Sequence, residues 1–177
     1  PELDTRANYP GRNASTRLDI AGLEQSISAL VHERLRPRDQ TGHGRPRLAL
    51  KGEVGVCDVH IDFNHWSGIV YLSRPEDCRD GTHFFRHRKT GLDRAPVFPG
   101  EAEAAGFRDG ETAIETILEG DAKRPDAWER TLTIPMKYNR LALFRGYLWH
   151  DAGESFGSGK EDGRLILPLF FSNVDAG

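Results

Sequence analysis

The chain has 177 residues, of which 37% are hydrophobic and 29% are charged, and it carries a net charge of −3. This length and composition suit one core, so we expect a single domain over residues 1–177. The charges form no basic stripe, which argues against nucleic acid or an anionic membrane surface as a partner. No apolar run approaches the roughly 20 residues that cross a bilayer, and no signal-peptide pattern opens the chain, so we expect a cytoplasmic location.

The first expected element is a helix near the N-terminus. Apolar residues between Ile20 and Leu35 recur at three- and four-residue spacing, which predicts a helix over about residues 16–36. Thr16 and Asp19 resemble an N-terminal capping pair, and Pro37 would end the helix. The polar stretch that continues to residue 47 contains glycines and prolines and predicts a loop.

Short segments of β-type composition follow, and they predict a mainly β fold. They occupy residues 48–56, 68–72, 82–85, 130–134, 141–144 and 164–171. Short strands without intervening helices indicate an antiparallel sandwich or barrel. The last strand is apolar on both faces, so we expect it to lie centrally and to be covered on each side. Residues 100–120 have a helical period and predict a helical insertion between strands, interpreted as a cover or lid, with a solvated acidic face as the alternative.

The chemistry-bearing pattern is His60-Ile61-Asp62. Residues two apart on an extended backbone project to the same face, so the imidazole and the carboxylate converge. His150 follows an apolar segment and a Gly146 turn, and could supply a second imidazole from a neighbouring strand. Two histidines and one carboxylate that leave open coordination positions form the facial triad of non-haem Fe(II) oxygenases. His60, Asp62 and His150 are therefore the candidate metal ligands and catalytic residues.

Arg164 opens the final apolar strand. A cation at that position needs an anionic partner if it is buried. The guanidinium fork pairs two-pronged with a carboxylate, so a dicarboxylate co-substrate would supply the anion. A His-x-Asp triplet alone is usually a surface pair or a turn, and Arg164 is one of the further matches that strengthen the metal-site interpretation.

An ordered series of motifs resembles the Fe(II)- and 2-oxoglutarate-dependent dioxygenases of the prolyl-hydroxylase-like branch. The series consists of His60-Ile61-Asp62, Ile69-Val70-Tyr71-Leu72, Gly81-Thr82-His83-Phe84-Phe85, Pro135-Met136-Lys137, Leu141-Ala142-Leu143-Phe144, His150-Asp151-Ala152-Gly153 and Gly163-Arg164-Leu165. The resemblance implies a double-stranded β-helix, or jelly roll, with its core at about residues 48–173. It also implies Fe(II), 2-oxoglutarate and O₂ as cofactor and co-substrates, with stimulation by ascorbate.

By the same resemblance, Tyr71 joins Arg164 in holding the distal carboxylate of 2-oxoglutarate, whereas a core aromatic is the plainer alternative. The carboxylate of Asp62 is present where halogenating relatives carry a small residue, so the resemblance implies hydroxylation, with release of succinate and CO₂. Two departures stand out. Asn139 occupies a turn where glycine is usual, and Asn tolerates the same left-handed geometry. Ile166 offers no hydroxyl to the co-substrate, so we expect another residue to help bind it.

The primary substrate is left open between an amino-acid-like metabolite, a peptide side chain and a natural-product intermediate. His65, Trp66 and Arg145 are the candidates for lining its pocket, with packing or solvent exposure as the alternative. His83 and His87 are expected to be structural or exposed, and Cys57 and Cys78 are expected to be reduced. Two rival functions are a cupin-type metal-binding protein that does not use 2-oxoglutarate and a non-catalytic interaction domain. The sequence does not predict the oligomeric state.

Overall fold

The computed structural model describes residues 9–53 and 58–175, and Cys57 lies outside this part of the chain. The protein is mainly β with antiparallel sheets, as expected from the sequence. Within the described residues one sheet has six strands, in which β1, β3, β9, β4 and β7 follow one another and β2 pairs with β9. Its strands are β1 (Arg12–Asn13), β2 (Leu35–Pro37), β3 (Arg47–Ala49), β4 (Trp66–Tyr71), β7 (Leu141–Arg145) and β9 (Arg164–Asn173).

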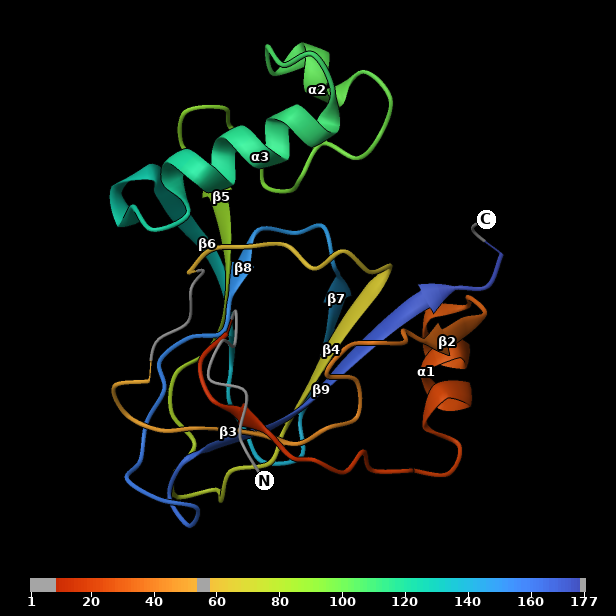
Figure 1. The fold of residues 1–177 in the computed structure, drawn as a ribbon, viewed down its shortest axis with the longest axis vertical. Helices are drawn as coiled ribbons and strands as arrows, with labels where there is room; N and C mark the ends of the chain where they lie inside the picture. The colour runs from red at the N-terminus through yellow and green to blue at the C-terminus, as the bar shows by residue number, and fades with distance from the viewer. Residues whose placement is uncertain (1–8, 54–57, 176–177) are drawn as a thin grey trace.

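A second sheet contains three strands in the order β6-β5-β8. These are β5 (Gly81–His87), β6 (Trp128–Pro135) and β8 (His150–Asp151). The two sheets stand opposite each other in Figure 1. Neither sheet closes into a barrel in the part of the chain that the structure describes, so the double-stranded β-helix stays an expectation.

Strand β9 is central and covered on both faces, which confirms the expectation for the last apolar segment. It pairs with β4 along one edge and with β3 and then β2 along the other. Leu167, Leu169 and Phe171 pack in a core cluster with Ile27 of α1 (Leu23–Val31). Burying each of these large side chains contributes on the order of 1.5–3 kcal/mol. Every second residue of β9 turns the other way, toward the cavity described below.

The N-terminal helix is shorter than predicted, and its expected boundaries at about residues 16 and 36 were wrong. Gly22 has a φ of 76° and precedes α1, while His32 has a φ of 56° and ends it. Positive φ at both ends is incompatible with a continuing right-handed helix. Leu35, assigned to the helix by its spacing, instead belongs to β2 and is buried opposite Asn173 of β9. Apolar spacing alone could not separate the helix from the strand that follows it.

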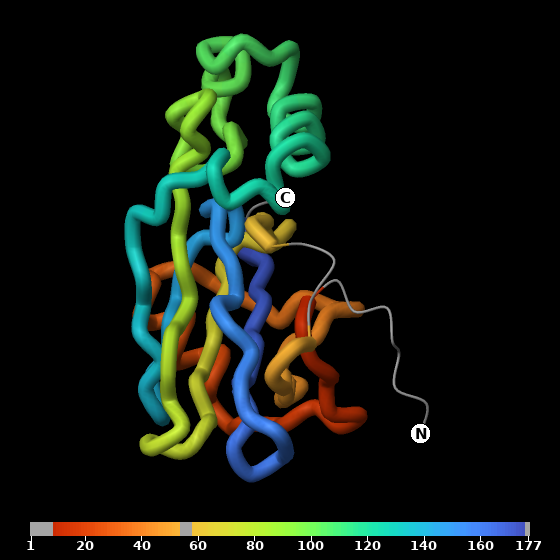
Figure 2. Tube along the Cα trace, turned by 90° about the vertical axis from the view of Figure 1, so that its left-hand side faces the viewer, coloured from red at the N-terminus to blue at the C-terminus, as the bar shows by residue number. Residues whose placement is uncertain are grey.

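The expected helical insertion is confirmed as structure and contains α2 (Glu101–Ala104) and α3 (Gly110–Asp121), followed by the short helix η1 (Pro125–Ala127). It lies beyond the ends of β5 and β6, at the top of Figure 1 and Figure 2. Ile117 of α3 packs in a cluster with Trp128 and Trp149, which attaches the insertion to the three-stranded sheet. Its role as a lid stays a prediction. No helix among the described residues is long and apolar enough to cross a membrane.

Candidate metal centre

The three expected metal ligands come together at the junction of the two sheets. His60 and His150 form an antiparallel bridge in which each backbone N–H donates to the other's carbonyl, at 2.9 and 3.0 Å. The side chains of His60, Asp62 and His150 each offer one ligand atom, and these atoms lie within 4.8 Å of one another. His150 belongs to β8. The backbone N–H of Asp62 donates to the carbonyl oxygen of Gly146 at 2.9 Å.

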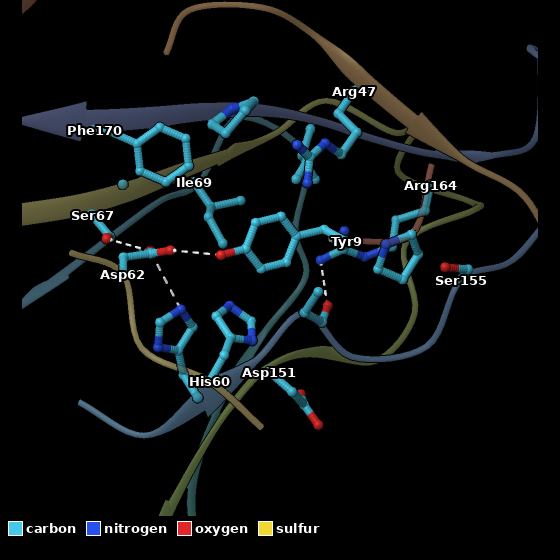
Figure 3. Close-up of a pocket in the computed structure, with 16 residues that line it drawn as sticks. Tyr9, Arg47, His60, Asp62, Ser67, Ile69, Asp151, Ser155, Arg164 and Phe170 are labelled. Atoms are coloured by element: carbon cyan, nitrogen blue, oxygen red, sulfur yellow. Dashed lines mark hydrogen bonds and ion pairs between the residues drawn. The ribbon is translucent and has the colours of Figure 1, made fainter. Parts of the chain in front are cut away.

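Two residues that the sequence analysis missed hold the Asp62 carboxylate. The hydroxyl of Ser67 in β4 donates to Asp62 Oδ2 at 2.5 Å, and the Asn64 amide donates to Ser67 Oγ at 2.8 Å. Figure 3 shows this carboxylate beside Ser67, with the His60 imidazole below it. Gly146 is required beside it, because a Cβ there would lie 2.6 Å from the Asp62 carbonyl oxygen and 2.3 Å from that of Asn64. Outer partners of this kind orient metal ligands and raise metal affinity.

The hydrogen bonds at the two imidazoles define which nitrogen is free. His60 Nδ1 lies 3.0 Å from the Asp58 carbonyl, and His150 Nδ1 lies 2.7 Å from the Leu148 carbonyl. A carbonyl oxygen only accepts, so each Nδ1 carries the proton and each Nε2 keeps its lone pair. Both histidines are therefore oriented in the way that metal-binding histidines usually are.

Burial and charge set suitable protonation states in the triad. Burial, together with the charge of His150, lowers the pKa of His60 to about 4. Burial raises the pKa of Asp62, but the close contact with His150, the positive charge that either histidine carries when it is protonated, and the Ser67 hydrogen bond outweigh it and lower the pKa to about 2. At neutral pH His60 is thus neutral and Asp62 is ionised, which are the forms that bind a metal ion.

Arg164 lies in the same cavity as the triad, as the sequence analysis expected. Arg164 is only 3% exposed, and its guanidinium donates to the Ala152 carbonyl at 2.5 Å. It forms no ion pair with any carboxylate of the described residues. Burial lowers the pKa of Arg164, against the charges of Tyr71, Asp80 and Asp151. A buried guanidinium without a paired carboxylate is costly, and an anionic ligand would relieve that cost.

Tyr9 separates the triad from Arg164, and nothing in its sequence context indicated this position. Its hydroxyl lies 3.4 Å from Asp62 Oδ1, and its ring centroid is 4.7 Å from that of His60. Figure 3 shows the phenol directed at Asp62, with Arg164 at the opposite side of the cavity. With Tyr9 in place the cavity has a volume of about 50 Å³, which is room for a few water molecules. The guanidinium of Arg47 lies 5.3 Å from the Tyr9 ring centroid and also lines this cavity.

Comparison with known proteins assigns the chain to a protein family. A model for a family of unknown function (DUF6445) matches residues 2–171. The chain belongs to this family. No curated protein and no solved structure matches it.

Tyr71 of this DUF6445 member does not line the cavity with Arg164. It is fully buried, and its hydroxyl lies 2.8 Å from the Thr82 hydroxyl and donates to the Ile134 carbonyl at 3.3 Å. Burial raises the pKa of Tyr71, although the Thr82 hydrogen bond and the charge of Arg164 lower it. The side chain packs in the core between the sheets, and its expected contact with 2-oxoglutarate stays a prediction.

The three expected substrate residues gather around Glu33 instead of the triad. Arg145 pairs with Glu33 at 2.5 Å and lies over the Trp66 ring, 4.1 Å from its centroid. His65 Nε2 and Trp66 Nε1 approach Glu33 at 2.7 and 3.2 Å. Burial raises the pKa of Glu33, but its bonds to Arg145, Trp66 and His65 lower it overall. These contacts join the segment after α1 to strands β4 and β7. His65 and Arg145 also line a cavity of about 570 Å³ that reaches Asp62.

His83 and His87 have structural roles, which confirms one of the two expectations for them. His83 and His87 are both buried, and each is held by hydrogen-bond partners. His83 lies 3.0 Å from Asp80 and 3.0 Å from Thr133, while His87 bridges Thr90 and Asp121. Asn139 has a φ of 61°, so the left-handed turn expected at this position is present. Cys78 is a free thiol.

Proposed function

We propose that this protein is an Fe(II)- and 2-oxoglutarate-dependent dioxygenase that hydroxylates an unactivated C–H bond and releases succinate and CO₂. The observation that carries the proposal is a His60–Asp62–His150 group that shares one cavity with the buried Arg164, which lacks a carboxylate partner among the described residues. A metal site and an anion site in one cavity match the two functions that a chelating dicarboxylate requires.

The donor set fits Fe(II). Two imidazole nitrogens and one carboxylate oxygen within 4.8 Å of one another suit a borderline metal, and three protein ligands leave positions for exogenous ligands. Other divalent metals of the first transition row also accept this donor set, with affinities that follow the Irving–Williams order. Iron is preferred in the proposal because the ordered motifs resemble those of iron oxygenases.

For 2-oxoglutarate to occupy this cavity, the Tyr9 ring would have to move. Arg164 offers a guanidinium for the distal carboxylate, and the metal site lies on the other side of the Tyr9 ring. A volume of about 50 Å³ is too small for a dicarboxylate of this length. We therefore expect the Tyr9 ring to leave its contact with Asp62 when 2-oxoglutarate binds. Tyr71 would then assist Arg164 only if its hydroxyl exchanged Thr82 for the ligand.

Each part of the chain has a defined task in this proposal. His60 and His150 would hold the metal through Nε2, while Asp62 would hold it as a carboxylate that Ser67 keeps in place. Ile69, Ile166 and Phe170 line the cavity with apolar surface and would exclude water from the reacting centre. When bound, the iron and 2-oxoglutarate supply the activation of dioxygen. We also propose that the two sheets form a double-stranded β-helix. Ascorbate is expected to stimulate turnover.

The proposal is tested by anaerobic titration of the Fe(II)-loaded protein with 2-oxoglutarate, followed by aerobic measurement of succinate. A charge-transfer absorbance that depends on both additions is expected, together with succinate formation. Asp62→Ala should lose metal binding, whereas Arg164→Ala should keep the metal and need far more 2-oxoglutarate. Metal binding without any response to 2-oxoglutarate would favour a cupin-type function, and absence of metal binding would favour an interaction domain.

A further inference from the structure

A second, larger cavity lies next to the metal centre. It has a volume of about 930 Å³, which is in the range of small-molecule sites. It shares Tyr9, Arg47, His60, Asp62 and Phe170 with the cavity that contains Arg164. The two cavities thus meet at the metal ligands, and an occupant of the larger cavity would reach the reacting centre.

The charges that line this larger cavity are strongly unbalanced. Its lining contains Arg12, Arg38, Arg45 and Arg47, and its only carboxylate among the described residues is the metal ligand Asp62. Arg12 is exposed and pairs with Glu53 at 3.4 Å. The other three arginines are half-buried and form no ion pair with the carboxylates that the structure describes.

The hydrogen bonds of these three arginines leave donors available. Arg47 uses Nε to donate to Asn13 at 2.8 Å, and Arg45 donates to the backbone carbonyls of Ala14 and Ser15. Arg38 has no side-chain hydrogen bond to the rest of the described chain. Arginine forks pair two-pronged with carboxylate or phosphate oxygens, so half-buried forks without such partners point to an anionic ligand. Ile61, Phe63, Leu118 and Phe170 add apolar surface to the same cavity.

We infer that the primary substrate is a small anionic molecule, with an apolar body and a carboxylate or phosphate group that Arg38, Arg45 and Arg47 bind in this larger cavity. The inference rests on the proposed function, because it assigns the substrate class of the same metal centre. Arg47 lies where the two cavities meet, whereas Arg38 and Arg45 line only the larger one. The anionic group is therefore held away from the metal, and the apolar body extends toward it.

The test is binding of a compound library to the Mn(II)-loaded protein by calorimetry, under anaerobic conditions and with 2-oxoglutarate added in excess. Each carboxylic acid in the library is matched by its carboxamide and by a phosphate monoester of similar shape. Acids or phosphates are expected to bind and the neutral amides to fail. The relative affinities of the two anionic arms identify which group the site takes.

Arg38→Gln should weaken the anionic binders by about tenfold, as expected for one charge-assisted hydrogen-bonded pair at a half-buried site. Arg36→Gln is the matched control, because Arg36 is an exposed cation of the same segment and should leave binding unchanged. Equal affinity of acids and amides, no binder in either anionic arm, or equal effects of the two variants would overturn the inference. The separate charge-transfer titration with 2-oxoglutarate tests the proposed function, so the two can fail independently.

Discussion

Replacing Arg164 by Met should separate the stability of the protein from its affinity for 2-oxoglutarate. Arg164 is buried without a carboxylate partner among the described residues, and Met keeps a long unbranched chain there without the charge. Removing an uncompensated buried charge should raise the unfolding free energy of the ligand-free protein by about 1 kcal/mol or more. For a chain of this size that corresponds to a rise in Tm of about 2–4 °C.

Addition of 2-oxoglutarate, by contrast, should stabilise the wild type more than Arg164→Met. At 100 times its Kd, 2-oxoglutarate should stabilise the Mn(II)-loaded wild type by about 2.7 kcal/mol, or roughly 5–11 °C in Tm. Truncating one partner of a buried charge pair costs about 2 kcal/mol or more, so the Kd should rise by about 30-fold. The same ligand concentration should then stabilise Arg164→Met by only about 0.9 kcal/mol, or about 2–4 °C.

Thermal unfolding with and without 2-oxoglutarate measures both quantities, and Arg36→Met provides the control for loss of an exposed cation. An equal ligand-induced shift in wild type and Arg164→Met would refute the role of Arg164 in binding the co-substrate. A lower Tm of the ligand-free variant would refute the conclusion that this buried charge is uncompensated.

Three further predictions concern the metal centre. Between pH 6.5 and about 4, His60 is protonated in the unfolded chain but stays neutral in the folded protein. As the pH falls through this range, the metal-free protein should therefore lose about 3 kcal/mol of unfolding free energy. Urea unfolding should show this slope in wild type and a flatter one in His60→Asn; identical slopes would contradict the burial argument. Ser67→Ala should weaken metal binding by about 10- to 100-fold in calorimetry, whereas Ser73→Ala removes an equally buried hydroxyl outside the triad and should not. Gly146→Ala should destabilise the protein and lower its metal affinity because the new Cβ overlaps backbone oxygens, while Gly120→Ala, with nothing within 4 Å, should be neutral or slightly stabilising. Unimpaired metal binding in Gly146→Ala would show that the Asp62 loop adapts.

Local patterns were enough to predict part of the candidate site. His60 and Asp62 are two residues apart, so their convergence followed from the alternation of an extended chain. The distant His150 required the ordered motifs, because pairing between remote segments depends on tertiary contacts. The central position of β9 was also predictable, because residues 165–171 are apolar at every position, which is typical of a strand covered on both faces.

The parts that the sequence could not predict depend on contacts between distant segments. Ser67 looks like any strand serine until β4 comes beside Asp62, and Tyr9 looks like part of a turn. The arginines of residues 36–47 were interpreted as a polar loop, although four arginines with Asp39 as the segment's single carboxylate were an available sign of an anion site. Gly22 and Leu35 were assigned to one helix because apolar spacing does not reveal backbone φ or a strand partner near the C-terminus.

Strand β9 divides two kinds of task between its faces. Leu167, Leu169 and Phe171 belong to the core cluster beside α1, while the intervening Ile166, Pro168 and Phe170 line the cavity of Arg164. Saturation mutagenesis of residues 164–171 should therefore give phenotypes that alternate from one position to the next: loss of folded protein at one residue, and altered ligand range in well-folded protein at its neighbour. Variation at the cavity positions is the route by which this strand can acquire new specificity without loss of its fold.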